Sequence, residues 1–196
     1  MIYAFTWLLA VLVLKFSFFL KIRGADNCRR IKGGFLIVCN HRSNWDPIVL
    51  GMSVRGRPVW YLAKEELFRH PLARFFLTRL HAIPISRGSG DIGAVKTAIK
   101  ALREGKILGM FPEGTRTRDE GLQPFEAGAA LLALRSGVPV VPAYIRGKYK
   151  LWHRVSITYG SPVNLTEMFP GRVNSVQVEK ATEVLYKAMQ DLAGRP

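Results

Sequence analysis

The sequence predicts an α/β fold in which helices flank a mixed, mostly parallel β-sheet. Short apolar runs typical of buried strands alternate along the chain with amphipathic runs typical of helices. Polar residues gather directly after several of these strands, as they do at the carboxyl ends of parallel strands. With 196 residues, the chain is long enough to form one domain with a substantial core.

The N-terminal stretch from Ile2 to Leu20 is almost continuously apolar, with only three polar interruptions. A bilayer-spanning helix needs about 20 such residues, and the stretch lacks the basic start and the small-residue cleavage site of a signal peptide. We therefore expect a hydrophobic membrane helix, with residues 1–24 as an anchor and 25–196 as the folded domain. Spanning the bilayer, lying in one leaflet and packing into the core remain alternatives.

The chain is strongly basic, with 29 Lys and Arg against 14 Asp and Glu and a net charge of +15. Such a surplus attracts phosphates, either of nucleic acid or of anionic lipid. The apolar N-terminus favours lipid, and the basic residues that follow it favour a cytoplasmic position for the rest of the chain. The two cysteines, Cys28 and Cys39, are too few for a disulfide framework, which suggests a reducing compartment.

Apolar runs predict strands at 35–40, 58–63, 81–86, 106–111, 138–145 and 153–160. Helical patterns cover 47–53, 64–80 on either side of a His-Pro pair, 91–104, 126–136 and 174–192. The helix at 91–104 should bury one apolar stripe, formed by Ile92, Val95, Ile99 and Leu102. The last helix should bury Val178, Leu185, Met189 and Leu192.

His41 and Asp46 lie in the predicted turn between the first strand and the helix that begins at Pro47. Asp46 stands before the proline, where an N-cap is expected. Across a turn the two side chains can meet, and a carboxylate on one imidazole nitrogen strengthens the other nitrogen as a base. The pattern therefore fits a His-Asp pair that takes a proton from a hydroxyl group. An ordinary helix cap next to a loop histidine fits the same residues.

Two more polar clusters follow strands. Arg87 comes after the strand at 81–86, and the run Pro112 to Arg118 comes after the strand at 106–111. If the strands are parallel, all three clusters meet in one crevice. The planar guanidinium group of an arginine suits a phosphate, to which it can donate two hydrogen bonds. Glu113 could orient a substrate hydroxyl or hold Arg87 or Arg116. The alternatives are a solvated arginine and a self-neutralising charged turn.

Other patterns give weaker hypotheses. Gly88-Ser-Gly90-Asp-Ile-Gly93 matches a dinucleotide-binding fingerprint. However, its aspartate would place a negative charge where the pyrophosphate should bind. Cys39 and His41 are two residues apart and could form a thiol–imidazole pair, although a small buried hydrophobe is the simpler interpretation of the cysteine. The remaining histidines show no metal-ligand spacing, so we assign no metal.

Four blocks in order resemble the glycerolipid acyltransferases: Asn40 to Asp46, Arg87 after Ala-Ile-Pro-Ile-Ser, Phe111 to Arg116, and Val138 to Ala143. The phrases Ala63-Lys-Glu-Glu-Leu-Phe68 and Phe125-Glu-Ala-Gly128 are also similar to that family. The resemblance extends from about residue 33 to 160. A single His-x-x-x-x-Asp motif is weak evidence, whereas four ordered blocks at compatible spacing are strong evidence.

The resemblance implies transfer of a fatty acyl group from coenzyme A or acyl carrier protein to the middle hydroxyl of lysophosphatidic acid. His41 would be the general base and Asp46 its partner, and Arg87 and Arg116 would hold the phosphate. The other substrate-binding residues would be Asn40, Glu113, Gly114, Thr115 and, for the acyl pocket, Pro142. The resemblance implies a membrane-bound enzyme that needs no cofactor beyond its acyl co-substrate and no nucleic acid.

The chemistry of the residues agrees with this implication. An alcohol needs a base within hydrogen-bonding distance, whereas a thioester is already activated. The backbone amides of Arg42 to Asn44 are candidate oxyanion donors. An acyltransferase for glycerol 3-phosphate or another lysophospholipid is a second hypothesis. A non-catalytic basic module that binds membrane or nucleic acid is a third, with aromatic residues that could stack on bases.

Overall fold

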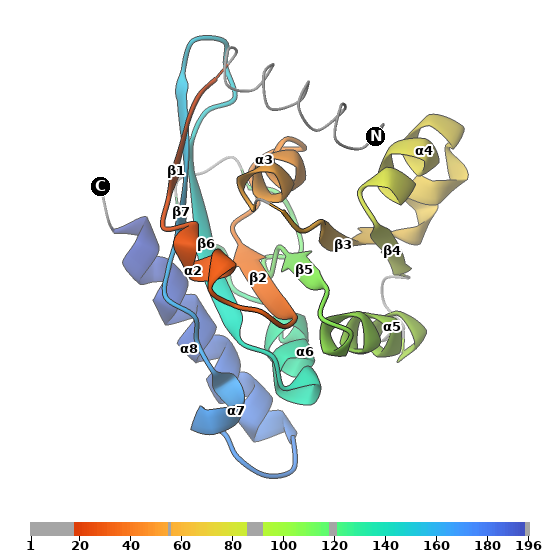
Figure 1. Ribbon diagram of the computed structural model, residues 1–196, viewed down its shortest axis with the longest axis vertical. Coiled ribbons are helices and arrows are strands. Elements are labelled where there is room, and N and C mark those ends of the chain that lie inside the picture. Colours follow the sequence, from red (N-terminus) through yellow and green to blue (C-terminus); the bar gives the residue numbers. More distant parts are fainter. Residues whose placement is uncertain (1–17, 55, 86–91, 118–120, 195–196) are drawn as a thin grey trace.

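The computed structural model describes residues 18–54, 56–85, 92–117 and 121–194, which form one sheet with helices on both faces (Figure 1). The sheet has seven strands in the order β1-β7-β6-β2-β5-β3-β4. All neighbouring strands are parallel except β6 and β7, so the predicted mixed, mostly parallel sheet is confirmed. The strands are β1 (Phe19–Arg23), β2 (Phe35–Cys39), β3 (Val59–Lys64), β4 (Ala82–Ile85), β5 (Ile107–Met110), β6 (Val140–Gly147) and β7 (Arg154–Tyr159).

The helices form two layers because alternate side chains of the buried strands point to opposite faces. Phe35, Ile37 and Cys39 of β2 pack on the side of α3, whereas Leu36 and Val38 pack on the side of α5, α6 and α8. The helices are α2 (Asp26–Arg29), α3 (Asp46–Ser53), α4 (Pro71–Arg79), α5 (Ile92–Arg103), α6 (Gly128–Ser136), α7 (Leu165–Met168) and α8 (Ser175–Ala193), with a 3₁₀ helix η1 (Glu65–Arg69). The short helices α2 and α7 were not predicted.

The buried stripe of α5 differs from the prediction, whereas that of α8 is confirmed. On α5, Ile92 is exposed, Val95 and Ile99 are half-buried, and the face against the sheet is formed by Ala94, Ala98, Ala101 and Leu102. Small alanine side chains allow a helix to pack closely, so they displace the larger residues to the edge of the contact. On α8 the buried residues are Val178, Ala181, Leu185, Met189 and Leu192.

Strand β1 corrects the expected N-terminal helix. Phe19 and Leu20 were interpreted as the end of an apolar helix, but they belong to an edge strand parallel to β7. Phe19, Lys21 and Arg23 are exposed and the residues between them are half-buried, which is the two-residue period of a strand. Residues 2–17 of the expected anchor lie outside the described residues. Within the described part of the chain, every helix falls short of the length or apolarity needed to cross a bilayer.

Candidate active site

The carboxyl ends of β2 and β5 bring two of the three predicted clusters together. These strands are adjacent and parallel, so the segments that follow them leave the sheet side by side. The backbone amide of Thr117 donates to the carbonyl of His41 at 3.0 Å and ties the two segments together. Strand β4 is parallel in the same sheet, but Arg87 and the residues around it lie outside the described residues.

Asn40 anchors the first segment at the point where β2 ends. Its side-chain amide donates to the carbonyl of Ile145 on β6 at 2.9 Å, and its side-chain oxygen accepts from the Ile145 amide at 2.7 Å. Both polar atoms of this buried side chain are thus hydrogen-bonded. The Asn40 side chain bonds to β6 just beyond the last backbone pair between β2 and β6. These bonds fix the backbone next to His41, and the expected substrate contact of Asn40 stays a prediction.

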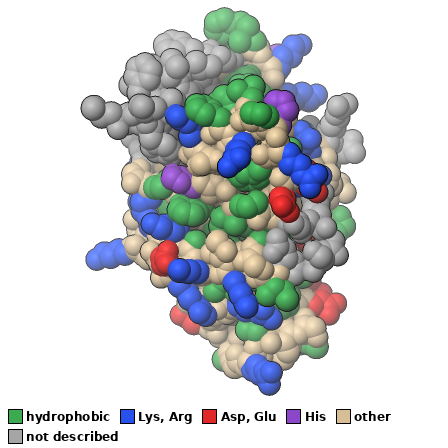
Figure 2. Space-filling model, turned by 90° about the vertical axis from the view of Figure 1, so that its right-hand side faces the viewer, with side chains coloured by type: hydrophobic (Ala, Val, Ile, Leu, Met, Phe, Trp, Pro, Cys, Tyr) green, Lys and Arg blue, Asp and Glu red, His purple; other side chains and the backbone are tan. Residues whose placement is uncertain are grey.

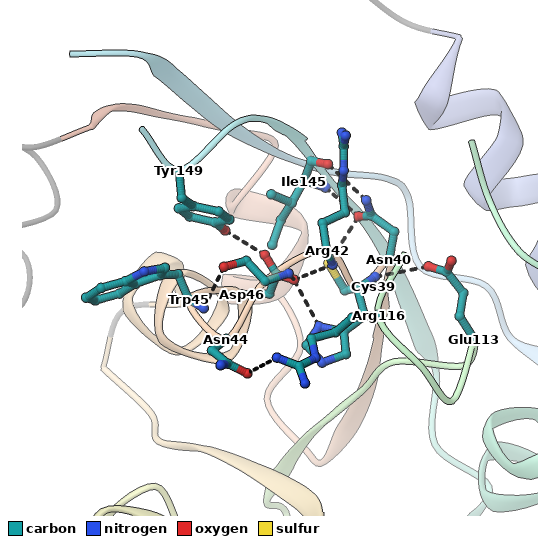
Figure 3. Close-up of polar contacts among 12 residues, drawn as sticks. Cys39, Asn40, Arg42, Asn44, Trp45, Asp46, Glu113, Arg116, Ile145 and Tyr149 are labelled. Atoms are coloured by element: carbon teal, nitrogen blue, oxygen red, sulfur yellow. Dashed lines mark hydrogen bonds and ion pairs between the residues drawn. The ribbon is translucent and has the colours of Figure 1, made fainter. Parts of the chain in front are cut away.

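His41 and Asp46 meet as the turn predicts (Figure 3). The imidazole Nδ1 lies 2.9 Å from the Asp46 carboxylate oxygen Oδ2. The carboxylate is fully buried, whereas 19% of the histidine side chain is exposed. An imidazole held through Nδ1 presents Nε2 to its surroundings. The pair therefore has a shielded end and an accessible end, which is the arrangement that general-base chemistry requires.

The buried Asp46 carboxylate receives four polar contacts. Besides the imidazole, Oδ2 accepts from the backbone amides of Arg42 and Ser43, both at 2.6 Å. Oδ1 accepts from the hydroxyl of Tyr149, in the loop between β6 and β7, at 2.7 Å. A buried carboxylate needs such donors because burial removes its water. The contacts also fix the rotation of the carboxylate and therefore the direction in which Oδ2 faces His41.

Two expectations about this turn are wrong. Asp46 is not an N-cap: α3 begins at Asp46, Trp45 precedes it, and Asp46 turns its carboxylate back to the amides of the turn. Those amides, of Arg42 and Ser43, were candidate oxyanion donors, but they are used by Asp46. Of the three candidate amides, only that of Asn44 stays a prediction.

The ring of Phe111 packs against the imidazole of His41. Phe111 follows β5, and its ring stacks on that of His41 with centroids 4.2 Å apart and planes inclined by 21°. The stacked ring restricts rotation of the histidine, and it removes water from one face of the base. Phe111 occurs in one of the motif blocks, but no pattern in the sequence indicated that its ring contacts His41.

Glu113 links the segment that follows β5 to the segment that follows β2. One carboxylate oxygen accepts from the backbone amide of His41 at 3.0 Å (Figure 3). The other accepts from the backbone amide of Gln123 at 3.1 Å. Burial raises the pKa of the Glu113 carboxyl above its ordinary value, while the two amides oppose the rise. The hypothesis that Glu113 holds Arg116 is wrong, because its carboxylate faces these backbone amides. Whether it also lines an acceptor site stays a prediction.

Gly114 allows the chain to turn sharply after Glu113. Its φ angle is +66°, in the left-handed region, and a Cβ atom there would lie 2.2 Å from a carboxylate oxygen of Glu126. A side chain is therefore excluded for both conformational and steric reasons. The turn leaves Thr115 and Arg116 exposed at the rim of the site.

Arg116 reaches back to the histidine turn. One of its guanidinium nitrogens donates to the side-chain oxygen of Asn44 at 2.6 Å, and the contact is exposed to solvent. The guanidinium thus stands beside the His41 turn with a single polar partner in the described part of the chain. The Thr117 hydroxyl, one residue further, is buried and has no hydrogen-bond partner among the described residues.

Cys39 has the environment of a core residue. It is fully buried, and its thiol donates to the side-chain oxygen of Asn40 at 3.6 Å. Burial, with Asp46 and Glu113 nearby, raises the pKa of the thiol well above its ordinary value. The thiolate needed for a nucleophile is therefore strongly disfavoured, which supports the simpler interpretation of Cys39.

Pro142 lies within β6, opposite Val38 of β2, and is buried. Its carbonyl accepts from the Gly160 amide at 2.8 Å, and its ring lies beside Gly160. The role in an acyl pocket stays a prediction.

The Gly88 to Gly93 pattern lies mostly outside the described residues.

The site thus combines a fixed His–Asp pair with a basic, solvent-facing loop, on the strand ends of an α/β sheet. Such a combination is typical of enzymes that activate a hydroxyl group beside an anionic substrate. The chain belongs to the Acyltransferase family, whose model matches residues 19–146.

Three named proteins illustrate the similarity. The 1-acyl-sn-glycerol-3-phosphate acyltransferase of Bacillus subtilis is 40% identical over 58% of this chain and 56% of its own length. That of Limnanthes douglasii is 31% identical over 74% of this chain and 54% of its own length. The chain thus spans a little over half the length of these relatives. The crystal structure of the LPA acyltransferase PlsC from Thermotoga maritima superposes with a TM-score of 0.68 at 25% identity, covering 92% of this chain and 74% of that chain.

Proposed function

We propose that this protein transfers a fatty acyl group from an acyl thioester to the middle hydroxyl of 1-acylglycerol 3-phosphate, forming phosphatidic acid for phospholipid synthesis. The observation that carries the proposal is the contact between His41 and the fully buried Asp46, found in a chain whose named relatives are 1-acyl-sn-glycerol-3-phosphate acyltransferases. The relatives supply the substrate class, and the pair supplies the base that an alcohol nucleophile needs.

In this mechanism His41 is the base and Asp46 is its partner. Nε2 of the imidazole takes the hydroxyl proton while the alcohol oxygen bonds to the thioester carbonyl carbon. The carbon–sulfur bond then breaks, and the imidazolium returns the proton to the departing thiolate. The Asp46 carboxylate, 2.9 Å from Nδ1, stabilises the positive ring in between. The thioester is already activated, so the reaction needs no cofactor besides its acyl donor.

The acceptor phosphate is held by Arg116 and Arg87, with Gly114, Thr115 and Glu113 around the acceptor. The exposed guanidinium of Arg116 and its contact with Asn44 of the histidine turn support this assignment. A phosphate held there would keep the reacting hydroxyl near His41. Such positioning can lower a barrier by roughly 7–11 kcal/mol in ideal cases.

The acyl donor is acyl-CoA or acyl carrier protein, and the acceptor and the product are lipids. We place the enzyme at the cell membrane, with its catalytic domain on the cytoplasmic face. The net charge of +15 and the apolar sequence from Ile2 onward support attachment to an anionic lipid surface.

A purified-protein assay in non-ionic detergent tests the proposal. Lysophosphatidic acid and glycerol 3-phosphate are offered in turn, each with acyl-CoA and with acyl carrier protein, and the lipid formed is identified by mass spectrometry. We expect phosphatidic acid from lysophosphatidic acid. Acylation of glycerol 3-phosphate in preference would assign the second acceptor instead, and the absence of transfer from either donor would refute the proposal.

A further inference from the structure

The end of the β6–β7 hairpin is an exposed apolar and basic surface. Leu151 and Trp152 are 57% and 69% exposed, and Phe19 of β1, 54% exposed, has its ring centroid 6.4 Å from that of Trp152. We call residues 148–154 together with Phe19 and Lys21 the hairpin tip. In Figures 1 and 2 the hairpin end is uppermost, and Figure 2 shows hydrophobic side chains there with Lys and Arg side chains close by.

Trp152 occupies a backbone position that rarely holds an aromatic residue. Its φ angle is +66°, a region in which glycine and asparagine are favoured. Because most of the indole is in solvent, burial within the chain does not explain a tryptophan at this position. A partner outside the chain would give the side chain a surface on which to bury.

The charge of the hairpin tip complements an anionic surface. From Arg146 to Arg154, both included, the sequence has four Lys or Arg and no Asp or Glu. Lys148, Lys150 and Arg154 are exposed. Tryptophan and leucine beside lysine and arginine are typical of segments that lie at a membrane interface, where indole rings settle at headgroup depth and cations meet lipid phosphates.

The hairpin tip is also joined to the candidate active site. Tyr149, between the two lysines, donates to Asp46 at 2.7 Å. Phe18 packs edge-to-face on Tyr149, with centroids 5.5 Å apart, and on the half-exposed Trp45, at 6.1 Å. In the sequence, the apolar run from Ile2 leads directly into Phe18. A lipid surface that receives this run would therefore lie next to the hairpin tip and the His–Asp pair.

We propose that the hairpin tip docks on an anionic lipid bilayer, with Trp152 and Leu151 among the headgroups and the lysines on the lipid phosphates. The proposal deepens the proposed function, because it rests on an enzyme that takes its acceptor from a membrane. It names the surface on which the enzyme sits and places the His41–Asp46 pair at the edge of the bilayer. An acidic protein, such as an acyl carrier, fits the charge but not the outward leucine and tryptophan.

Vesicle binding of the full chain tests the charge of the tip. The variant Lys148→Gln/Lys150→Gln is compared with Lys180→Gln/Lys187→Gln, which removes two exposed lysines from α8. We expect the first variant to bind vesicles of phosphatidylglycerol and phosphatidylcholine about 30-fold more weakly than the wild type. Binding of the first variant to vesicles of pure phosphatidylcholine should change much less. Binding of the α8 variant should also change much less, on either kind of vesicle. Equal losses in the two variants would overturn the proposal.

Fluorescence quenching tests the tryptophan separately from any anchoring by the N-terminus. Vesicles with brominated acyl chains should quench part of the emission of the wild type and of Val176→Asn, a control at an exposed position of α8. That part should be missing in Trp152→Asn, which keeps a residue suited to the left-handed backbone. If the quenched fraction is the same in all three proteins, Trp152 does not enter the lipid and the proposal fails.

Activity measurements separate this proposal from the proposed function. In non-ionic detergent the lysine variant should transfer acyl groups at the wild-type rate, and on anionic vesicles more slowly. A wild type without transferase activity would refute the function but leave the binding measurements valid. A lysine variant that binds vesicles normally but reacts slowly with acyl carrier protein alone would assign the hairpin tip to the carrier and overturn lipid docking.

Discussion

The two loops that make the candidate site are built in opposite ways. In the β2–α3 turn, a fully buried carboxylate is held by two backbone amides, a tyrosine and the imidazole itself. In the loop after β5, Thr115 and Arg116 are exposed, and the only polar contact of the Arg116 side chain within the described part of the chain is the solvent-facing one with Asn44. The proposed base is thus preorganised within the protein, whereas the proposed phosphate-binding guanidinium faces solvent.

The comparison predicts different kinetic effects on the two sides. Changes in the turn should reduce the rate of the chemical step, because they alter a group whose position is already fixed before the substrate arrives. Changes in the basic loop should weaken binding of the phosphorylated acceptor.

The largest effect is expected for His41→Ala. Loss of the base should lower kcat by about 10²- to 10⁴-fold. Circular dichroism and thermal melting should show a folded protein, because the side chain lies at the accessible end of the pair. His70→Ala, at the start of α4, serves as the matched control and should remain active. A His41→Ala protein with near-normal activity would remove the base assignment.

Arg116→Ala should act mainly on binding. A hydrogen bond to a charged group contributes about 1.5–3 kcal/mol, so KM for lysophosphatidic acid should rise by about one to two orders of magnitude. The change in kcat should be smaller, and Arg172→Ala, a second exposed arginine, should have no effect. We expect Arg87→Ala to resemble Arg116→Ala. An effect on KM of the acyl donor alone would contradict the assigned role.

Tyr149→Phe should produce a smaller loss in the rate. It removes one of the contacts on Asp46 and keeps the ring that packs on Phe18. We expect kcat to fall about fivefold, from a loss of roughly 1 kcal/mol, with KM of both substrates unchanged. In a His41→Ala background the same substitution should change little. An equal loss in both backgrounds would show that Tyr149 acts independently of the base.

Glu113→Gln should reveal the burial of this carboxyl in the pH dependence of stability. Because the folded-state pKa is raised, the folded protein binds the proton more tightly than the unfolded chain. The free energy of unfolding of the wild type, relative to the variant, should therefore fall as pH rises from the ordinary glutamate pKa through the raised one. Denaturant titrations at several pH values measure this difference. An increase over that range would contradict the direction of the shift.

The smallest effect is expected for Cys39→Ser. The serine hydroxyl can replace the thiol as a donor to Asn40, and no thiolate is needed for the proposed reaction. Acyl transfer should stay within about twofold of the wild type, while burial of a more polar group should reduce stability by roughly 1–3 kcal/mol. A folded but inactive variant would restore the thiol mechanism.

Much of this architecture was predictable because periodicity and composition are local properties. Buried strands such as β2 appear as unbroken apolar runs, and the proline after Asp46 marks the start of α3. Strand β1 was missed because its alternating pattern follows a much longer apolar run. On α5, alanines rather than larger residues were buried, because the distance between helix and sheet is set by packing and not by hydrophobicity alone.

The sequence by itself determined the strand-to-helix turn that holds His41 and Asp46, the polar segments after the strands, and the excess of positive charge. Only the tertiary structure decided what surrounds them. It brings the hydroxyl of Tyr149 to Asp46 and the carboxylate of Glu113 to the amide of His41, and it uses the amide of Asn40 to join β2 to β6. These partners are 72 to 105 residues apart in the chain. At such separations no local pattern records a contact, because the order of the strands in the sheet determines which side chains meet.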